Sequence, residues 1–306
     1  MEKSDILFRK LGIALHNLRD GIQVFGVNIA FYGITIAIGM VAGMLIAQWQ
    51  AKRTGQNPDV YWDFALYGII FAVIGARLYY VIFAWNTFKD DLISIFNLRT
   101  GGLAIYGGVI GAVLTAVIYS RVKNVSFRLI ADTGVLGLLA GQIIGRWGNF
   151  FNREAFGKFY DGLFSMQLNL AHVGGDYTSN IETLTTRYAG KPQALNAIIE
   201  IRNHTQVIEG VEYISVHPTF LYESAWNLAL LLGLIVYSKY KQFDGEIFLL
   251  YLAGYGLGRF WIEGLRTDQL FLWNSPLAIS QILSGVLVIV SVVLILFYRR
   301  GKSVLS

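Results

Sequence analysis

The sequence predicts an all-α polytopic membrane protein with seven transmembrane helices and a small external head between spans four and five. Three observations predict this class. Hydrophobic residues make up 55% of the 306 residues and charged residues only 15%, whereas an ordinary soluble domain carries about 25% charge. Seven stretches are long and apolar enough to cross a bilayer. Lysine and arginine gather in the short connections on one side.

The composition excludes several other classes. The apolar content is too high for a disordered chain, and no collagen-like or coiled-coil repeat occurs. The net charge of +5 is modest, and basic residues at the ends of apolar segments serve orientation in a bilayer, so no nucleic-acid partner is expected. The chain has no cysteine, which excludes a disulfide, a thiolate metal ligand or a cysteine nucleophile supplied by this chain.

Residues 1–23 precede the spans and are expected to form an amphipathic helix on the membrane surface. Phe8, Leu11, Leu15 and Leu18 recur at spacings of three or four residues, which is the period of a helix with one apolar face. A cleaved signal peptide fits poorly, because a short apolar core of about 7 to 15 residues should follow the basic run.

The spans follow from length, since a bilayer core of about 30 Å needs about 20 mostly apolar residues per helix. Seven stretches qualify: 24–49, 61–84, 101–120, 127–149, 218–238, 246–264 and 276–298. Spans one to four therefore occupy residues 24–149, and spans five to seven with a short tail occupy 218–306. The connection 150–217 contains short alternating runs between threonine, asparagine and glycine turns, and it is expected to form the external head.

Basic residues in the short connections predict the orientation. Ten of them fall on one side: Lys52, Arg53, Arg121, Lys123, Arg128, Lys239, Lys241, Arg299, Arg300 and Lys302. The opposite short loops hold only Lys89, Arg99 and Arg266. The C-terminus is thus expected in the cytoplasm and the N-terminus outside, although four basic residues of the N-terminal tail oppose this: Lys3, Arg9, Lys10 and Arg19.

Polar side chains inside the predicted spans or at their ends gather in the outer leaflet. The alternating topology places ten of them there: Tyr32, Arg77, Tyr106, Arg146, Asn149, His217, Glu223, Arg259, Glu263 and Arg266. An ionisable group in a span is costly unless it is paired or hydrated, so each is a candidate functional residue. The alternative is that helix ends are polar and that arginine reaches to the headgroups, which explains any single residue better than the asymmetry.

The spacing of these residues indicates a shared anion site. Arg259, Glu263 and Arg266 lie on one face of a helix, and two arginines against one glutamate leave a surplus positive charge. Arg146 is followed by three further polar side chains, Asn149, Asn152 and Glu154. Because guanidinium binds phosphate through two parallel hydrogen bonds, a phospholipid headgroup is the expected ligand. Structural ion pairs between helices are the alternative.

Glycines support two different interpretations. Gly137, Gly141 and Gly145 repeat every four residues, as do Gly39 and Gly43, and this pattern favours close helix packing. The pairs Gly101–Gly102 and Gly107–Gly108 instead flank Tyr106 at the start of a span. Bare backbone at a helix N-terminus suits a phosphate, so Gly107 and Gly108 are expected at the lipid.

Three stretches together resemble one family, the prolipoprotein diacylglyceryl transferases. They read GRWGNFFNREAFG over residues 145–157, HPTFLYE over 217–223 and RFWIEGLR over 259–266. The resemblance implies a bacterial plasma-membrane enzyme without cofactor or metal, whose active site faces the outer leaflet. It implies transfer of the sn-1,2-diacylglyceryl group from phosphatidylglycerol to the lipobox cysteine of a prolipoprotein signal peptide, with release of sn-glycerol 1-phosphate.

This chemistry assigns expected roles to the residues. Charge grows on the departing phosphate oxygen, so Arg146 and Arg259 are the first candidates for stabilising the transition state. Arg266 and Arg77 are the next candidates for this role. The groups expected to hold the arginines and the lipid are Asn149, Asn152, Glu154, Tyr32 and Glu263. His217 and Glu223 belong to the second motif.

Tyr106 departs from the family, because many members have histidine there as a candidate general base. Tyrosine, with a pKa of about 10, is a poor base near neutral pH. Tyr106 is therefore expected to donate a hydrogen bond to the substrate, while the alternative places a base at Glu154, Glu263 or His217. Two other functions are the alternatives. A lipid transporter should carry its charges near the midplane between repeats, and an intramembrane serine protease would depend on Ser284, which has no histidine partner in a span.

Overall fold

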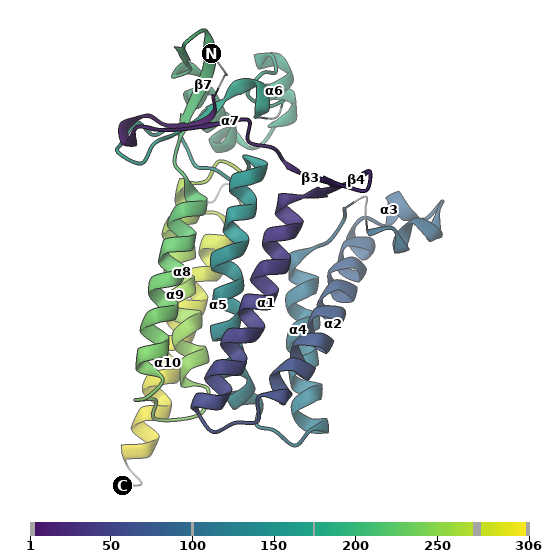
Figure 1. Ribbon diagram of the computed structural model, residues 1–306, viewed down its shortest axis with the longest axis vertical. Coiled ribbons are helices and arrows are strands. Elements are labelled where there is room, and N and C mark those ends of the chain that lie inside the picture. The colour runs from purple at the N-terminus through teal and green to yellow at the C-terminus, as the bar shows by residue number, and fades with distance from the viewer. Residues whose placement is uncertain (1–3, 99–100, 174, 272–276, 304–306) are drawn as a thin grey trace. The chain divides into compact units, whose positions relative to one another are not determined.

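The computed structural model describes residues 4–98, 101–173, 175–271 and 277–303 and is mostly helical (Figure 1). It divides into two compact units, each described here by itself. The first comprises Met1–Ala42, Leu139–Lys239 and Leu249–Ser306, and the second comprises Gly43–Leu138 and Tyr240–Phe248. Lys3, Arg99 and Pro276, which entered the predictions of topology and of the last span, lie outside the described residues.

Six described helices are long and apolar enough to cross a membrane. They are α1 (Phe31–Arg53), α2 (Asp59–Phe83), α4 (Ile105–Val122), α5 (Phe127–Asn152), α8 (Thr219–Tyr237) and α10 (Ile279–Ser303). The predicted sixth span is also a helix, α9 (Glu246–Leu265), but it is not among these six. Arg259 and Glu263 lie within α9 and lower its hydropathy. The chain is therefore a multi-pass membrane protein.

The N-terminal segment is not the amphipathic helix that the spacing predicts. Residues Ser4–Phe8 form β1 and Ile13–His16 form β2, an antiparallel hairpin joined through the short 3-10 helix η1 (Arg9–Leu11). Ile6 and Phe8 are both buried and Leu7 between them is only partly buried, so the strand period of two outweighs the helical spacing. A second hairpin, β3 (Gly21–Val24) with β4 (Val27–Ala30), delays the first helix from residue 24 to Phe31.

The segment 150–217 folds together with the hairpin of β1 and β2, and the result is not purely helical. An antiparallel sheet has the strand order β2-β1-β5-β7-β6. Its remaining strands are β5 (Met166–Asn169), β6 (Gln206–Ile208) and β7 (Val211–Val216). The other elements are the 3-10 helix η4 (Leu170–His172), α6 (Ile181–Arg187) and α7 (Pro192–Asn203). We call this part of the first unit, which comprises the five-stranded sheet, η4, α6 and α7, the head.

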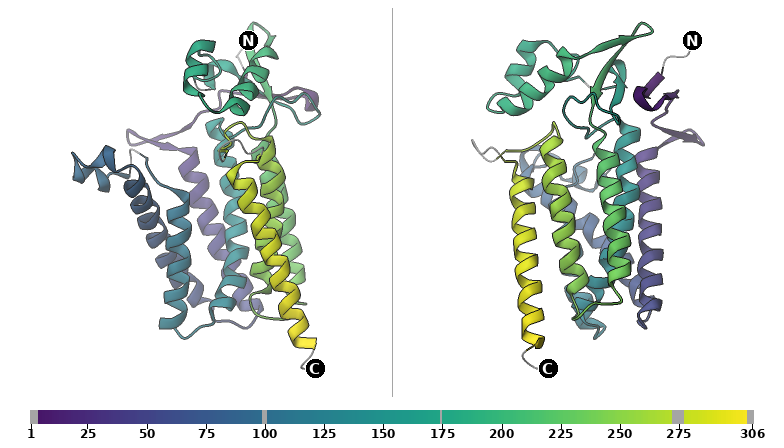
Figure 2. Two further views of the ribbon diagram at one scale, coloured as in Figure 1. Left: turned by 180° about the vertical axis from the view of Figure 1, so that it is seen from behind. Right: turned by 90° about the vertical axis from the view of Figure 1, so that its left-hand side faces the viewer.

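The core of the head continues into the ends of two long helices. Ile6, Leu168 and Ile214 are fully buried, and Phe150 of α5 and Phe220 of α8 pack in the same cluster. Burying such side chains contributes about 2 kcal/mol each. Within the first unit, the head therefore lies where α5 ends and α8 begins (Figures 1 and 2). That is also where the polar residues of the first motif are found.

The glycine repeats pack helices closely, as predicted. In the first unit a Cβ on Gly39 would lie 3.0 Å from the carbonyl oxygen of Gly141. In the second unit a Cβ on Gly43 would lie 2.6 Å from the carbonyl oxygen of Gly137. At both places α1 and α5 approach to backbone contact, which only small residues allow. This part of the prediction is confirmed.

Candidate active site

The site is built around the carboxylate of Glu223, near the start of α8. Oε2 of Glu223 lies 2.6 Å from Nη2 of Arg146 on α5, and Oε1 lies 3.0 Å from Nη1 of Arg259 on α9. Arg259 also pairs with Glu263 one turn further along α9, at 2.6 Å. Both carboxylates are buried. The first, second and third sequence motifs thus meet in one ion-pair network.

Arg266 completes the network just after the end of α9. Its Nη1 lies 3.6 Å from Oε1 of Glu223, and its Nε and Nη2 bind both oxygens of Asp268 at 2.8 and 2.6 Å. Burial would raise the pKa of Asp268, but the hydrogen bonds and charge of Arg266 outweigh it and lower this pKa. We call these six side chains the arginine cluster: Arg146, Glu223, Arg259, Glu263, Arg266 and Asp268.

The predicted surplus of positive charge is wrong for this cluster. Three arginines face three carboxylates. Glu223 and Asp268 add their charges to that of Glu263, the one acid that the helical spacing indicated. Donors are nevertheless in excess. A guanidinium carries five N–H groups, and among the described residues Arg146 pairs only through Nη2. The side chains of Arg146 and Arg259 are 23% and 19% exposed, so their remaining donors are within reach of an anion.

The polar end of the first motif forms a second group next to Arg146. Asn149 and Asn152 both donate to Oε1 of Glu154, at 3.0 and 3.2 Å. These three predicted residues therefore lie together, as expected. Tyr32 of α1 lies on the same stretch of α5, since a Cβ on Gly148 would be 2.8 Å from its ring. The bare Gly148 makes room for this ring two residues from Arg146.

Gly157 is the point at which the three motifs join through the backbone. Its N–H donates to the carbonyl of His217 at 2.9 Å, and the next residue, Lys158, donates to the carbonyl of Leu265 at 2.7 Å. A Cβ on Gly157 would lie 2.7 Å from the Cβ of His217 and 2.8 Å from the oxygen of Leu265. Only glycine fits this crossing, which fixes the first motif against the second and third.

His217 lies between two tyrosines and makes no described contact with the arginine cluster. Its ring stacks on Tyr160 with centroids 4.0 Å apart, and its Nδ1 lies 3.2 Å from the hydroxyl of Tyr222. Burial and the nearby charge of Lys158 lower the pKa of His217. These contacts favour a role for His217 in anchoring the chain that enters α8 over the role of a base.

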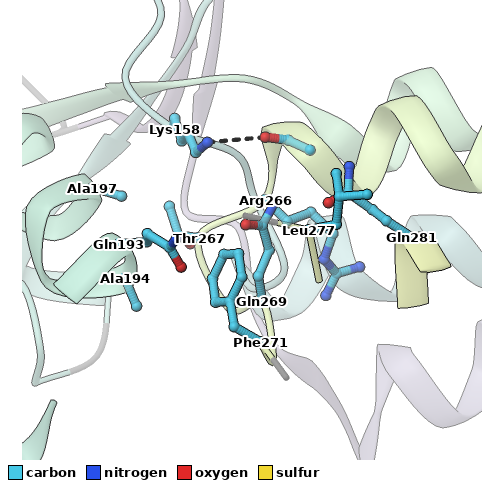
Figure 3. A pocket seen from close by; sticks show the side chains of 11 residues that line it. Lys158, Gln193, Ala194, Ala197, Arg266, Thr267, Gln269, Phe271, Leu277 and Gln281 are labelled. Carbon is cyan, nitrogen blue, oxygen red and sulfur yellow. Dashed lines mark hydrogen bonds between the residues drawn. The ribbon is translucent and has the colours of Figure 1, made fainter. Parts of the chain in front are cut away.

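A cavity of about 250 Å³ opens beside Arg266 (Figure 3). Gln193 and Ala197 of α7 line one side and Gln281 of α10 lies opposite (Figure 3). Lys158 also lines it and donates to the carbonyl of Gly264 at 3.0 Å. The described lining residues include two cations, Lys158 and Arg266, and no carboxylate, so this space suits an anionic group.

Arg77 does not have the role that the sequence predicts. It lies in the second unit, is buried, and donates all five of its N–H groups to backbone carbonyls of the segment 94–102. No donor remains for a phosphate. Arg77 instead holds the loop that follows α3 (Trp85–Phe88) and the 3-10 helix η2 (Leu92–Phe96) against α2.

Gly107 and Gly108 also differ from the prediction. A Cβ on Gly107 would lie 2.2 Å from the carbonyl oxygen of Gly75, and one on Gly108 would lie 3.5 Å from that of Ala72. Both glycines therefore face α2 in a close helix contact and not a lipid.

Tyr106, at the first turn of α4, is exposed, and its ring centroid is 6.4 Å from that of Tyr79.

Sequence reasoning missed Asp268 and Arg153. Asp268 follows the third motif by two residues, and an acid so near a motif arginine was the available signal. Arg153 lies inside the first motif and is buried against acids of the N-terminal segment. That pairing depends on a contact between distant parts of the sequence, so spacing along the chain gave no indication of it.

The long apolar helices and the arginine cluster define a class, a multi-pass membrane protein with buried ion pairs beside a small head. Comparison with known proteins gives the family. The family model for prolipoprotein diacylglyceryl transferase matches residues 21–297, and the chain belongs to this family.

Two relatives illustrate the similarity. A phosphatidylglycerol--prolipoprotein diacylglyceryl transferase of Clostridioides difficile (strain 630) is 38% identical over 266 residues, covering 87% of this chain and 89% of the relative. A protein of the same name from Bacillus cereus (strain B4264) is 39% identical over 282 residues, covering 92% of each chain. The similarity thus extends over nearly the whole length of both proteins.

Proposed function

We propose that this protein transfers the sn-1,2-diacylglyceryl group of phosphatidylglycerol to the thiol of the lipobox cysteine in a prolipoprotein signal peptide. The observation that carries the proposal is the arginine cluster, in which Arg146 and Arg259 share the buried carboxylate of Glu223 and keep donors for an anion. The names of the relatives agree with this reaction. It is the first step of bacterial lipoprotein maturation.

The reaction forms one bond and breaks one. The thiolate of the cysteine, whose proton has passed to water, attacks the glyceryl carbon that carries the phosphate, a C–S thioether forms, and the C–O bond breaks. The electron pair goes to the phosphate oxygen, and sn-glycerol 1-phosphate leaves. Negative charge grows on that oxygen as the bond breaks, so guanidinium groups aimed at it stabilise the transition state more than the ground state.

The side chains of the arginine cluster have separate roles in this reaction. Arg146 and Arg259 contact the phosphate, and Glu223 and Glu263 fix the planes of the two guanidinium groups. Arg266 adds a third cation, held by Asp268.

The glycerol headgroup is bound by four other side chains, those of Asn149, Asn152, Glu154 and Tyr32. Tyr106 donates a hydrogen bond to the substrate, and the cationic field lowers the pKa of the substrate thiol, whose ordinary value is about 8.5.

The proposed setting is the bacterial plasma membrane. α9 is the sixth of seven spans, because its charges are paired in the arginine cluster and need no water. The N-terminus and the head are outside and the C-terminus is in the cytoplasm, as the basic residues of the short connections predict. Under this topology the arginine cluster lies at the level of the outer headgroups.

The test uses the full chain in vesicles of phosphatidylglycerol with a lipobox peptide. The peptide should gain the mass of one diacylglyceryl group, and glycerol phosphate should appear in equal amount. A peptide with serine in place of the cysteine is the control and should gain nothing. Folded protein that forms neither product would overturn the proposal, and lipid movement without either product would favour a transporter.

A further inference from the structure

We propose that the N-terminal arm, residues 4–20, holds the turn that presents Glu154, and that it acts through Arg153. The inference rests on the proposed function, in which Glu154 binds the headgroup. It concerns a positioning residue: Arg153 pairs with acids of the arm, and neither it nor the arm belongs to the arginine cluster.

The turn after α5 has a costly backbone conformation. Arg153 has φ +52° and Ala155 has φ +57°, both in the left-handed region that favours glycine, where another residue costs about 1 kcal/mol or more. Glu154 lies between them, and its N–H donates to the carbonyl of Asn149 at 3.1 Å. The same turn brings its carboxylate to the amides of Asn149 and Asn152. The two left-handed residues therefore decide where the carboxylate of Glu154 lies.

Arg153 is held almost entirely by the arm. Its Nη1 donates to Oδ1 of Asp20 at 2.6 Å, its Nη2 donates to the carbonyl of Leu18 at 2.5 Å, and the same Nη2 lies 3.9 Å from Oδ2 of Asp5. The side chain is 6% exposed, and its Nε has no described hydrogen-bond partner. A guanidinium this deeply buried is costly unless acids compensate it. Here Asp5 and Asp20 compensate it.

The arm is itself fixed, so it can hold the turn. β1 pairs with β5 in the head sheet, and Ile6 is fully buried in its core. Asp5 is also tied locally, since it accepts from the N–H of Leu18 and lies 2.9 Å from Nδ1 of His172. Asp5 therefore keeps partners when Arg153 is changed. Asp20 is exposed, and its backbone carbonyl accepts from Phe31.

These contacts predict an interaction that can be measured between Asp20 and Arg153. With arginine at 153, the ion pairs offset the cost of the left-handed turn. Glycine adopts that conformation freely, so a chain with Arg153→Gly does not need the acids. Removing the charge of Asp20 should therefore disturb the turn when residue 153 is arginine and leave it undisturbed when residue 153 is glycine. A pair that merely added stability to the arm would show no such dependence on the backbone preference of residue 153.

The experiment combines Asp20→Asn with Arg153→Gly in a double-mutant cycle on the full chain in phosphatidylglycerol vesicles. Asp20→Asn should raise the KM for phosphatidylglycerol about fivefold, the upper range for a partly exposed ion pair, with kcat per folded enzyme within about twofold. In the Arg153→Gly background the same substitution should leave KM unchanged. The matched control is Asp161→Asn. It removes another ion pair between the arm and the rest of the head, Lys10–Asp161, and should not change KM.

Hydrogen exchange of peptides covering residues 149–157 gives a readout that does not depend on activity. Asp20→Asn should speed exchange there when residue 153 is arginine and leave it unchanged when residue 153 is glycine. Equal effects in both backgrounds, no effect in either, or the same effect from Asp161→Asn would overturn the proposal. Should the wild-type form no lipidated peptide, the proposed function fails, and hydrogen exchange still decides whether the arm holds the turn.

Discussion

Arg146 on α5 and Arg259 on α9 bind opposite oxygens of one buried carboxylate, that of Glu223, at 2.6 and 3.0 Å. Neither arginine could be placed so near the other without this acid, because like charges repel strongly where water is scarce. Glu223 thus holds two guanidinium groups at a fixed spacing and leaves their outer edges to an anion. The second motif contributes to the site through this residue and not through His217.

Glu223→Gln tests that organisation. The substitution keeps the size of the side chain but removes the charge that the two arginines share, so we expect the free energy of unfolding to fall by about 3 kcal/mol. Transfer activity should fall at least about tenfold, because the arginines separate. Asp268→Asn is the control, since Asp268 is more exposed and its loss should have a smaller effect on both quantities. Equal losses in the two variants would contradict the central place of Glu223.

Arg77→Lys separates a structural from a lipid-binding role. Lysine offers three N–H groups where Arg77 gives five to the carbonyls of residues 94–102. At least two of these carbonyls lose their partner, and thermal unfolding should show a loss of about 2 to 4 kcal/mol. The KM for phosphatidylglycerol should stay unchanged. A raised KM in a variant of normal stability would restore the lipid-binding role that the sequence predicts.

Tyr106→Phe tests the proposed hydrogen-bond donor at the start of α4. The exposed ring can be replaced without a change in packing, so stability should be unchanged. Removing a hydroxyl that bonds only to substrate should lower kcat/KM about tenfold. Full activity of the phenylalanine variant would assign Tyr106 to structure.

His217 makes the stability of the head depend on pH. Its pKa in the folded protein is below the ordinary 6.5, because burial and the charge of Lys158 disfavour the imidazolium. The unfolded chain therefore binds the proton more readily, and stability is lost as the pH falls through about 6.5 towards the lower folded value. Between about pH 7.5 and pH 5.5, the melting temperature of the wild-type should fall more than that of His217→Gln. Parallel curves would show that His217 is not responsible.

The membrane helices could be predicted from the sequence because the signal is local. Six helices lie within a few residues of predicted spans, and the first departs only because the hairpin of β3 and β4 occupies residues 24–30. The arm could not be predicted correctly. The spacing of Phe8, Leu11, Leu15 and Leu18 fits a helix, but Ile6 and Phe8 pack in a sheet in which β5, β6 and β7 lie more than 150 residues away in the sequence.

The candidate site could be predicted in part for the same reason. Arg146, Asn149, Asn152 and Glu154 are close in the sequence and close in space. Arg77 shows the limit of this reasoning. An arginine in a span indicates a buried charge, but only the structure shows that the partners are five carbonyl groups and not a lipid. The neutral balance of the arginine cluster likewise depends on Glu223, which belongs to another helix.

The central claim is that bidentate guanidinium binding stabilises the departing phosphate, and Arg146→Lys tests it most directly. Lysine keeps the charge beside Glu223 but cannot offer two parallel donors, so kcat/KM for phosphatidylglycerol should fall about 100-fold in folded enzyme. Arg187→Lys, at an exposed arginine that pairs with Asp176 on the head, should keep its activity. If Arg146→Lys transfers the diacylglyceryl group as fast as the wild-type, the phosphate is not bound in this way and the account is contradicted.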